Sequence, residues 1–151
     1  MSRITPFLWF HDRAEEAAEF YVSLFPNSRI VHTVHSEPGQ VLVVEFELDG
    51  QRIQALNGGP HFTLDEAFSL VVDAPTQDEI DRLWDALIAD GGRPSQCGWL
   101  QDRFGLSWQV VPPILHELLA DPDPDRAARA NAAMMQMGKL DIAALVAAAD
   151  G

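Results

Sequence analysis

The sequence predicts an α+β fold in which two βαβββ modules form a curled mixed sheet, followed by a C-terminal helical tail. Three observations predict it: short β-rich segments bounded by turn signals, one amphipathic helix in each half, and the same order of elements in both halves. The hydrophobic fraction of 47% among 151 residues is that of a folded globular protein. We expect a single domain, with module one at about 3–57, module two at about 67–112 and the tail at about 121–151.

The first module begins with an apolar, aromatic strand at residues 3–10. Asp12 and Glu15 then form a pattern like a capping box, and apolar residues at helical spacing predict a helix near 13–24. Three β-rich segments follow, and Asp49-Gly50 predicts a tight hairpin turn between the last two. These segments are residues 28–36, 41–48 and 51–57.

The second module repeats this order after a turn-rich connection at residues 57–66. Thr76 and Glu79 form a second capping-box pattern, and the helix that follows them ends at Gly91-Gly92. The apolar positions of this helix follow a strict helical period: Ile80, Leu83, Trp84, Leu87 and Ile88. Strands are predicted at residues 67–74, 93–97, 98–102 and 106–112.

Alternation along residues 106–111 separates two faces of the predicted sheet. Leu106, Trp108 and Val110 point one way, and Ser107 and Gln109 point the other. The larger groups suit the face under the helix, so the smaller and more polar face is expected to line a concave cavity.

The tail begins with prolines that cannot continue a strand, and it predicts two helices at about 124–136 and 140–149. Its apolar groups are too numerous for an isolated helix: Met134, Met135, Met137, Leu140, Ile142, Leu145 and Val146. Leaving several such side chains in water would cost several kcal/mol, at roughly 25 cal/mol per Å2. We therefore expect the tail to pack on the sheet domain or on another subunit, and we expect a homodimer.

Charge and cysteine content exclude several classes of partner. Ten basic residues against 23 acidic residues give a net charge of −13, which repels nucleic acid and anionic membrane surfaces. The chain carries one cysteine, Cys97, and no apolar segment long enough to span a bilayer or to act as a signal peptide. These features predict a soluble cytoplasmic protein whose partner is a small molecule.

Several motifs in order resemble the PhnB-like group, whose members are often labelled 3-demethylubiquinone-9 3-methyltransferase-like. This group belongs to the vicinal oxygen chelate superfamily of glyoxalases and bleomycin-resistance proteins. The motifs cover nearly the whole chain: PFLWF, AEEAAEFYVSLFPNS, NGGPHF, QCGWLQDRFGLSWQVVP and AMMQMGKLDIAALVAA. The resemblance implies the glyoxalase/bleomycin resistance-like fold, commonly as a homodimer, and in the wider superfamily often a divalent metal in the cavity.

The positions that match the superfamily's metal ligands carry the wrong chemistry in this chain. The resemblance places Pro6 at the first ligand position, Gln54 or Leu56 on the fourth strand, Ala67 or Ser69 on the fifth, and Gln109 on the last. Apolar side chains cannot ligate, and neutral amide oxygens are weak ligands for a divalent cation that must lose water. We therefore expect no catalytic metal and no cofactor.

Five residues are the candidates for binding a ligand: Gln54, Ser69, Trp99, Asp102 and Gln109. Trp99 can stack on a flat ligand or fill the core. Asp102 can close a cavity or belong to the hairpin turn through Gly105. Gln109, if buried, must bond to Ser69, Gln54 or a ligand.

Three functions are open on these residues. A binding or sequestration module needs only aromatic walls and a few placed amides. An enzyme needs a proton-transfer group, for which Asp102, Cys97 and Glu45 are the candidates, although Cys97 has no activating neighbour in sequence and is expected to be structural. A methyltransferase is disfavoured because no glycine-rich turn links a strand to a helix to grip S-adenosylmethionine.

Overall fold

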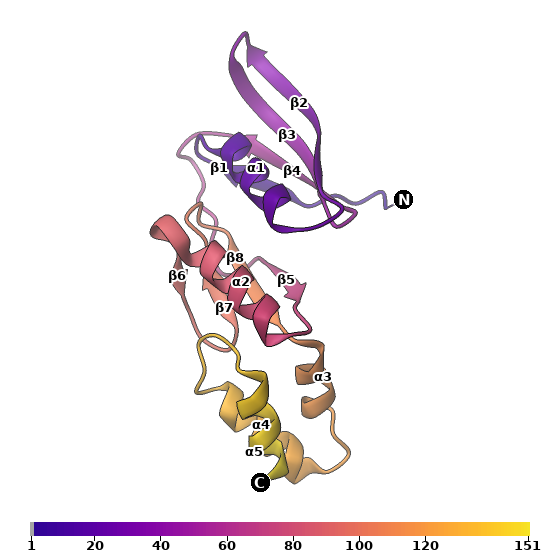
Figure 1. Cartoon of the computed structure of the whole chain (residues 1–151). Helices are drawn as coiled ribbons and strands as arrows, with labels where there is room; N and C mark the ends of the chain where they lie inside the picture. Colours follow the sequence, from indigo (N-terminus) through magenta and orange to yellow (C-terminus); the bar gives the residue numbers. More distant parts are fainter. Residues whose placement is uncertain (1) are drawn as a thin grey trace. The chain divides into compact units, whose positions relative to one another are not determined.

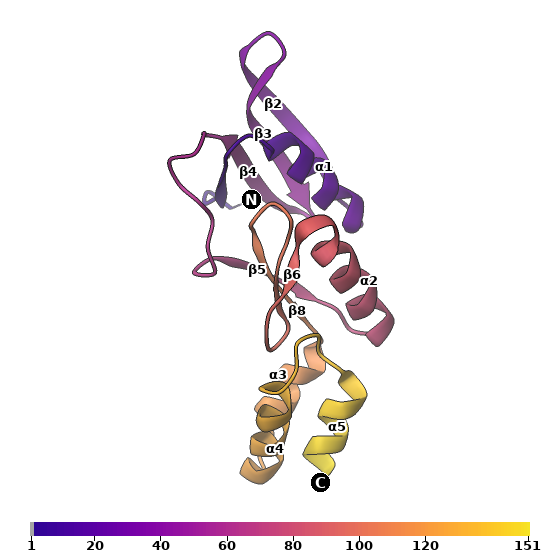
Figure 2. The ribbon, with the colours of Figure 1, turned by 90° about the vertical axis from the view of Figure 1, so that its left-hand side faces the viewer.

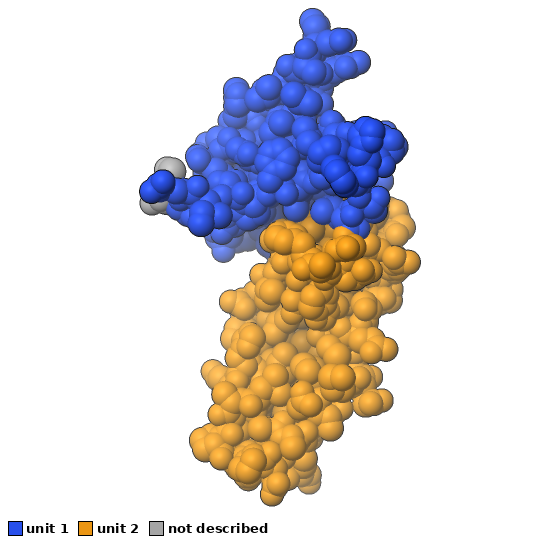
Figure 3. Space-filling model, turned by 180° about the vertical axis from the view of Figure 1, so that it is seen from behind, with its two compact units in different colours: residues 1–64 blue, residues 65–151 orange. Residues whose placement is uncertain are grey.

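The computed structural model describes residues 2–151 and divides the chain into two compact units, Met1–Leu64 and Asp65–Gly151 (Figure 3). Each unit contains a four-stranded mixed sheet with one helix packed on one face (Figures 1 and 2). The second unit also contains the helical tail. The predicted α+β fold and its repeated βαβββ order are therefore confirmed.

The first unit contains a sheet of order β1-β4-β3-β2. Its strands are β1 (Phe7–Phe10), β2 (Arg29–Glu37), β3 (Gln40–Leu48) and β4 (Gln51–Asn57), and its helix is α1 (Ala14–Leu24). β1 pairs parallel with β4, and the other pairs are antiparallel. Alternate strand residues are buried beneath α1, among them Val44, Phe46 and Ile53. The opposite face of this sheet is the open face of the first unit.

The start of α1 differs from the prediction. Arg13, and not Asp12, precedes the first helical residue, and no side chain of the helix start caps it. Instead the Ala14 amide donates a 2.8 Å hydrogen bond to Asn57 Oδ1, at the end of β4. The prediction from the local capping pattern was wrong because a side chain 43 residues away in sequence accepts the hydrogen bond of the first helical amide.

The second unit contains a sheet of order β5-β8-β7-β6. As in the first unit, the strands that come first and last along the chain, here β5 and β8, pair in parallel. Its elements are β5 (Ser69–Asp73), α2 (Gln77–Ile88), the 3-10 turn η1 (Ala89–Gly91), β6 (Arg93–Pro94), β7 (Trp99–Gln101) and β8 (Ser107–Val111). The predicted cap of α2 is confirmed, since Thr76 Oγ1 accepts a 3.2 Å hydrogen bond from the Glu79 amide. Trp108 is buried at 1% exposure, as its position under the helix predicts.

The strands predicted at 93–97 and 98–102 are shorter in the structure, and the segment between them turns. Cys97 and Gly98 both have positive φ, at 58° and 86°, which a strand cannot contain. Their amides donate to the carbonyl oxygens of Met137 and Gly138, at 2.8 and 2.9 Å. The tail therefore takes the hydrogen bonds that a longer β6–β7 pair would have made.

The tail begins earlier than predicted, at the end of β8, and forms three helices, α3 (Pro113–Leu119), α4 (Pro124–Met134) and α5 (Ile142–Asp150). The last two were predicted, whereas α3 was missed, although prolines before an apolar run are a helix-start signal. These helices bury a core of their own: Val111, Leu115, Leu118, Ala130, Leu140, Leu145 and Ala149. Of the two possibilities predicted for the tail, the structure shows packing within the chain, with α4 beside α5 (Figure 2).

The Gln77 side chain ties the tail to α2. Its amide nitrogen donates to the Leu140 carbonyl at 3.0 Å, and its carbonyl oxygen accepts from the Ile142 amide at 2.9 Å. Lys139 adds an ion pair to Asp81 of α2 at 2.9 Å. None of the helices among residues 2–151 is long and apolar enough to cross a bilayer.

Candidate functional site

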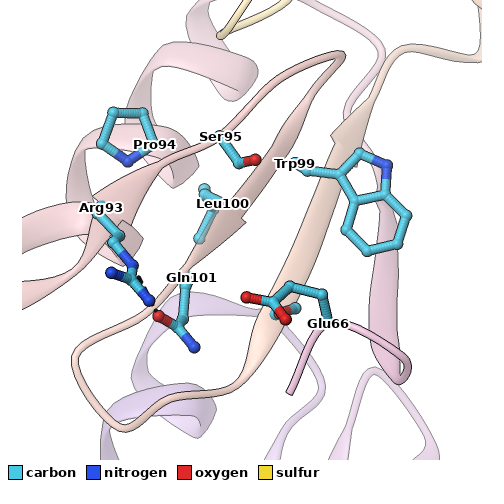
Figure 4. Close-up of a pocket in the computed structure, with 8 residues that line it drawn as sticks. Glu66, Arg93, Pro94, Ser95, Trp99, Leu100 and Gln101 are labelled. Carbon is cyan, nitrogen blue, oxygen red and sulfur yellow. Dashed lines mark hydrogen bonds between the residues drawn. The ribbon is translucent and has the colours of Figure 1, made fainter.

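A pocket of about 250 Å3 lies on the second sheet, on the side opposite α2, which is the open face of the second unit (Figure 4). It is lined by Glu66, Arg93, Pro94, Ser95, Trp99, Leu100, Gln101 and Ser107. The walls thus combine a cation, an anion, an indole ring and hydroxyl and amide groups. This mixture is typical of pockets that bind small organic molecules.

Strand register brings these polar groups into rows. Arg93 pairs with Gln101, and Gln101 pairs with Ser107. In the next row Trp99 pairs with Gln109. Because residues directly opposite each other in neighbouring strands share a face, each row presents its side chains side by side.

Ser107 is the most informative residue of the pocket. The residue is 1% exposed, and its hydroxyl has no hydrogen-bond partner among the described residues. A buried hydroxyl without a partner costs about 1–3 kcal/mol, so native proteins rarely leave one. Ser107 is one of the residues that line the pocket, so a small shift of its side chain would bring the covered hydroxyl to a bound group, which could supply the missing hydrogen bond.

Arg93 is held in place by a neighbouring amide. Its Nε donates to Gln101 Oε1 at 2.9 Å, and Gln101 Nε2 donates in turn to the Gly105 carbonyl at 3.2 Å. This chain of bonds uses the Nε–H of the guanidinium and leaves N–H groups of its terminal nitrogens as further donors. Among residues 2–151 no carboxylate forms an ion pair with Arg93.

Glu66 enters the pocket from the turn before β5. Asp65 shapes this turn, since its Oδ1 accepts a 2.9 Å hydrogen bond from the Ala67 amide. In Figure 4 the Glu66 carboxylate lies between the Gln101 amide and the Trp99 ring. Glu66 and Arg93 were not among the residues predicted from sequence, because neither lies in an apolar strand or a recognisable motif.

Ser69, Trp99 and Gln109 lie together on the open face of the second unit. Gln109 Nε2 donates a 3.0 Å hydrogen bond to Ser69 Oγ, so Ser69 is its partner of the two considered from sequence. Trp99 is half-buried and lines the pocket. These three residues remain predicted ligand contacts.

Asp102 does not line the pocket and is buried in the turn between β7 and β8. It is 2% exposed, and its Oδ1 accepts from the amides of Phe104 and Leu106 at 2.9 and 3.1 Å. Its Oδ2 accepts from Trp108 Nε1 at 2.9 Å. Both oxygens are therefore used within the β7–β8 hairpin, which favours the turn interpretation over ligand binding.

Gln54 and Glu45 lie on the open face of the first unit. Gln54 Nε2 donates to Glu45 Oε2 at 3.5 Å, and Glu45 Oε1 forms an ion pair with Arg52 Nε at 2.7 Å. The Arg52 guanidinium therefore balances the negative charge of this carboxylate. Gln54 is therefore engaged within its own sheet, and its predicted role as a ligand contact is untested.

Cys97 lies outside the pocket, in the turn covered by the tail. It is a half-buried free thiol whose Sγ lies 3.7 Å from Met135 Sδ. The amides of Cys97 and Gly98 bond to backbone carbonyl groups of the tail. This setting favours the structural interpretation.

The side chains present do not suit a tightly held divalent metal. Among residues 2–151 no group of three or more His, Cys, Asp or Glu is arranged to hold one. On the first sheet, His32 pairs in register with Glu45, but that carboxylate is already paired with Arg52. On the second sheet the central polar groups are the amide of Gln109 and the hydroxyls of Ser69 and Ser107. Neutral amides and hydroxyls alone are poor ligands for such ions.

Comparisons with known proteins agree with this fold. The family model described as 3-demethylubiquinone-9 3-methyltransferase matches residues 2–111. A solved structure described as a putative 3-demethylubiquinone-9 3-methyltransferase, PhnB protein, from Bacillus cereus is 34% identical, with a TM-score of 0.67; the match covers 74% of this chain and 99% of that one. No protein of curated function matches significantly.

Two more distant structures share the fold alone. Protein PA1353 from Pseudomonas aeruginosa is 19% identical, with a TM-score of 0.60, over 73% of this chain and 96% of that one. The fosfomycin resistance protein FosX from Listeria monocytogenes, solved with Mn(II) and sulfate, is 15% identical, with a TM-score of 0.59, over 78% of this chain and 97% of that one. The family model ends at Val111, the last residue of β8, and therefore does not cover the helices that follow.

Proposed function

The chain belongs to the 3-demethylubiquinone-9 3-methyltransferase family, and from this premise we propose that it is a PhnB-like protein that binds a small organic molecule on the open face of its second sheet. The observation that carries the proposal is the buried Ser107 hydroxyl, which lacks a partner at the wall of a pocket. Trp99 supplies an apolar surface beside it, and Arg93 supplies a charged donor. A bound molecule would satisfy the hydroxyl and cover the indole.

We propose further that binding requires no catalytic metal. The support is the donor set: the strands of the open faces offer amides, hydroxyls and a carboxylate already paired with Arg52, and Glu66 adds a single carboxylate from the turn before β5. FosX shares the fold and was solved with Mn(II), so the fold accommodates a metal when the side chains suit it. The positions that the family resemblance matches to such ligands are Pro6, Gln54 or Leu56, Ala67 or Ser69, and Gln109.

The alternative function is a metal-independent enzyme of the glyoxalase superfamily. Of the three candidate proton-transfer groups, Asp102 is engaged by three N–H donors and Glu45 by Arg52. Cys97 lies under the tail, away from the pocket lining. Glu66 is the carboxylate that lines the pocket, and it would have to act as the acid or base.

Methyl transfer is not part of the proposal, although the family is described by that activity. The connection between β1 and α1 is His11-Asp12-Arg13, and that between β5 and α2 is Ala74-Pro75-Thr76. Neither contains a glycine that would let the backbone approach a cofactor at the helix start. This supports the view that S-adenosylmethionine is not bound at either connection.

We also propose that the protein is a homodimer in the cytoplasm. The tail supports the dimer less than the sequence predicts, because its helices bury a core within the chain, although Met135 is 52% exposed. Exposed apolar side chains support it instead: Phe7 on β1 is 53% exposed, Phe62 in the connection before β5 66% and Val71 on β5 55%. A second copy of the chain would cover such groups. Light scattering that gave the monomer mass, with the protein folded, would contradict the dimer.

A thermal-shift experiment tests the binding proposal. The full-length protein is treated with EDTA and heated with each member of a panel of small metabolites, with and without Mg, Mn, Ni and Zn. We expect at least one compound to raise Tm without added metal, and we expect the Ser107→Ala and Trp99→Ala variants to lose that shift. Stabilisation only in the presence of metal would contradict the metal-free proposal, and chemical conversion of the stabilising compound would favour the enzyme.

A further inference from the structure

We propose that the ligand of this pocket is a small zwitterion, an α-amino acid or a close derivative, whose carboxylate binds Arg93 and Ser107 and whose ammonium group binds Glu66. This inference rests on the proposed function and specifies its ligand class. It starts from the fact that the pocket is lined by one cation and one anion that are not paired with each other.

The carboxylate side of the site is formed by Arg93 and Ser107. The bond from Arg93 Nε to Gln101 fixes the plane of the guanidinium and leaves its terminal nitrogens to donate. A planar fork of N–H donors matches the two oxygens of a carboxylate. Ser107 lies in the same register row, through Gln101, and its hydroxyl lacks a partner.

The ammonium side of the site is formed by Glu66. Its carboxylate forms no ion pair or hydrogen bond with any of residues 2–151, and it lies on the Trp99 side of Gln101 (Figure 4). An ammonium group there would meet a carboxylate and the neighbouring indole ring, and both attract cations. Arg93 and Glu66 thus present opposite charges at separate places on one wall.

The size and charge of the protein restrict the ligand further. A volume of about 250 Å3 corresponds to roughly eight water molecules at about 30 Å3 each, so the pocket suits a molecule of amino-acid size. The net charge of −13 repels a simple anion, whereas a zwitterion carries no net charge. The side chain of the ligand would lie against the Trp99 ring, which favours an aromatic or branched apolar group.

Matched compounds test the two charges separately. Isothermal titration compares L-phenylalanine with 3-phenylpropionate, which lacks the amine, and with phenethylamine, which lacks the carboxylate. L-Leucine, 4-methylpentanoate and isopentylamine form a second series. We expect the amino acid of at least one series to bind about tenfold more tightly than both of its analogues. Equal or weaker binding of both amino acids would overturn the zwitterion.

Charge-neutral variants assign each contact. Arg93→Gln should remove the advantage of the amino acid over the amine, and Glu66→Gln should remove its advantage over the acid. Arg82→Gln on α2 and Glu117→Gln on α3 change the net charge equally at exposed positions outside the pocket, and both should leave all affinities unchanged. Circular dichroism confirms that each variant is folded. If the control variants weaken binding as much as the pocket variants, the contacts assigned here are wrong.

The same titrations separate the two proposals. Binding of a neutral or singly charged metabolite that requires Trp99 and Ser107, without a preference for amino acids, would leave the small-molecule function standing and overturn the zwitterion. Failure of amino acids and of the whole metabolite panel to bind would overturn both.

Discussion

Gln109 on β8 donates a 3.0 Å hydrogen bond from its side-chain nitrogen to the hydroxyl oxygen of Ser69 on β5. The bond crosses the parallel pair of β5 and β8 at one edge of the second sheet, where Ser69 pairs in register with Ser107. Because the amide nitrogen is the donor, the carbonyl oxygen Oε1 of Gln109 is left as an acceptor on the open face. The bond therefore orients a polar group beside the pocket.

A double-mutant cycle measures this relationship. Ser69→Ala, Gln109→Ala and the double variant are unfolded in urea. The coupling free energy between the two sites should be about 0.5–1.5 kcal/mol, which is the net worth of one hydrogen bond. Single-variant losses that simply add would show that the two side chains do not interact in solution.

Asp102 should be important for stability. Asp102→Asn keeps the shape of the side chain but replaces one acceptor oxygen by an NH2 group, which cannot accept from the amides or from the Trp108 ring nitrogen. The free energy of unfolding should fall by about 1.5–3 kcal/mol, as for buried hydrogen bonds to a charged group. Asp85→Asn, on the exposed side of α2, is the matched control and should change it little. Equal effects of the two variants would contradict the structural role.

Two glycines with similar backbone angles separate conformational strain from tail packing. Gly98 has φ of +86° and a Cβ there would lie 3.0 Å from Leu140 Cδ1, whereas Gly105 has φ of +93° and nothing within 4 Å. Gly105→Ala should cost roughly 1–2 kcal/mol from backbone strain alone. Gly98→Ala should cost about 1–3 kcal/mol more, because it also displaces Leu140. Equal losses in urea unfolding would mean that the tail is not packed against this turn.

The order of elements was predictable because local patterns determine it. The apolar period of α2 and the Thr76 cap lie within a few residues of each other, and both are seen in the structure. The start of α1 was not predictable, because Asn57 satisfies it from the far end of the sheet. The short β6 and β7 likewise depend on the tail, which takes the amides of Cys97 and Gly98.

The candidate site was predictable only in its strand residues. Alternation along β8 placed Ser107 and Gln109 on the open face, and the Gln109–Ser69 bond follows from the parallel pairing of β8 with β5. Arg93 lies in a strand of two residues and Glu66 in a turn, where periodicity carries no information. For Asp102 the sequence left two environments open, a ligand or its own hairpin, and the structure shows its carboxylate bonded within the hairpin.

The contact between α2 and the tail should depend on pH. The Gln77 and Lys139 side chains, which both donate to the Asp81 carboxylate, hold the pKa of Asp81 below its ordinary value of 3.8. The folded state therefore binds this proton less readily than the unfolded state, and Asp81 stabilises the fold above that value. The contribution is lost as pH falls through the lower, folded pKa. Between about pH 6 and pH 3, the urea midpoint of Asp81→Asn should fall less than that of wild type, and an equal fall would contradict the assignment.

The most direct test of the account is the thermal shift of the EDTA-treated protein with the metabolite and amino-acid panel, measured in parallel on wild type, Trp99→Ala and Ser107→Ala. The account predicts that a small organic compound raises Tm of wild type without any metal and does not raise Tm of the two variants. Stabilisation that appears only when a transition metal is restored, or that is unchanged in both variants, would contradict it.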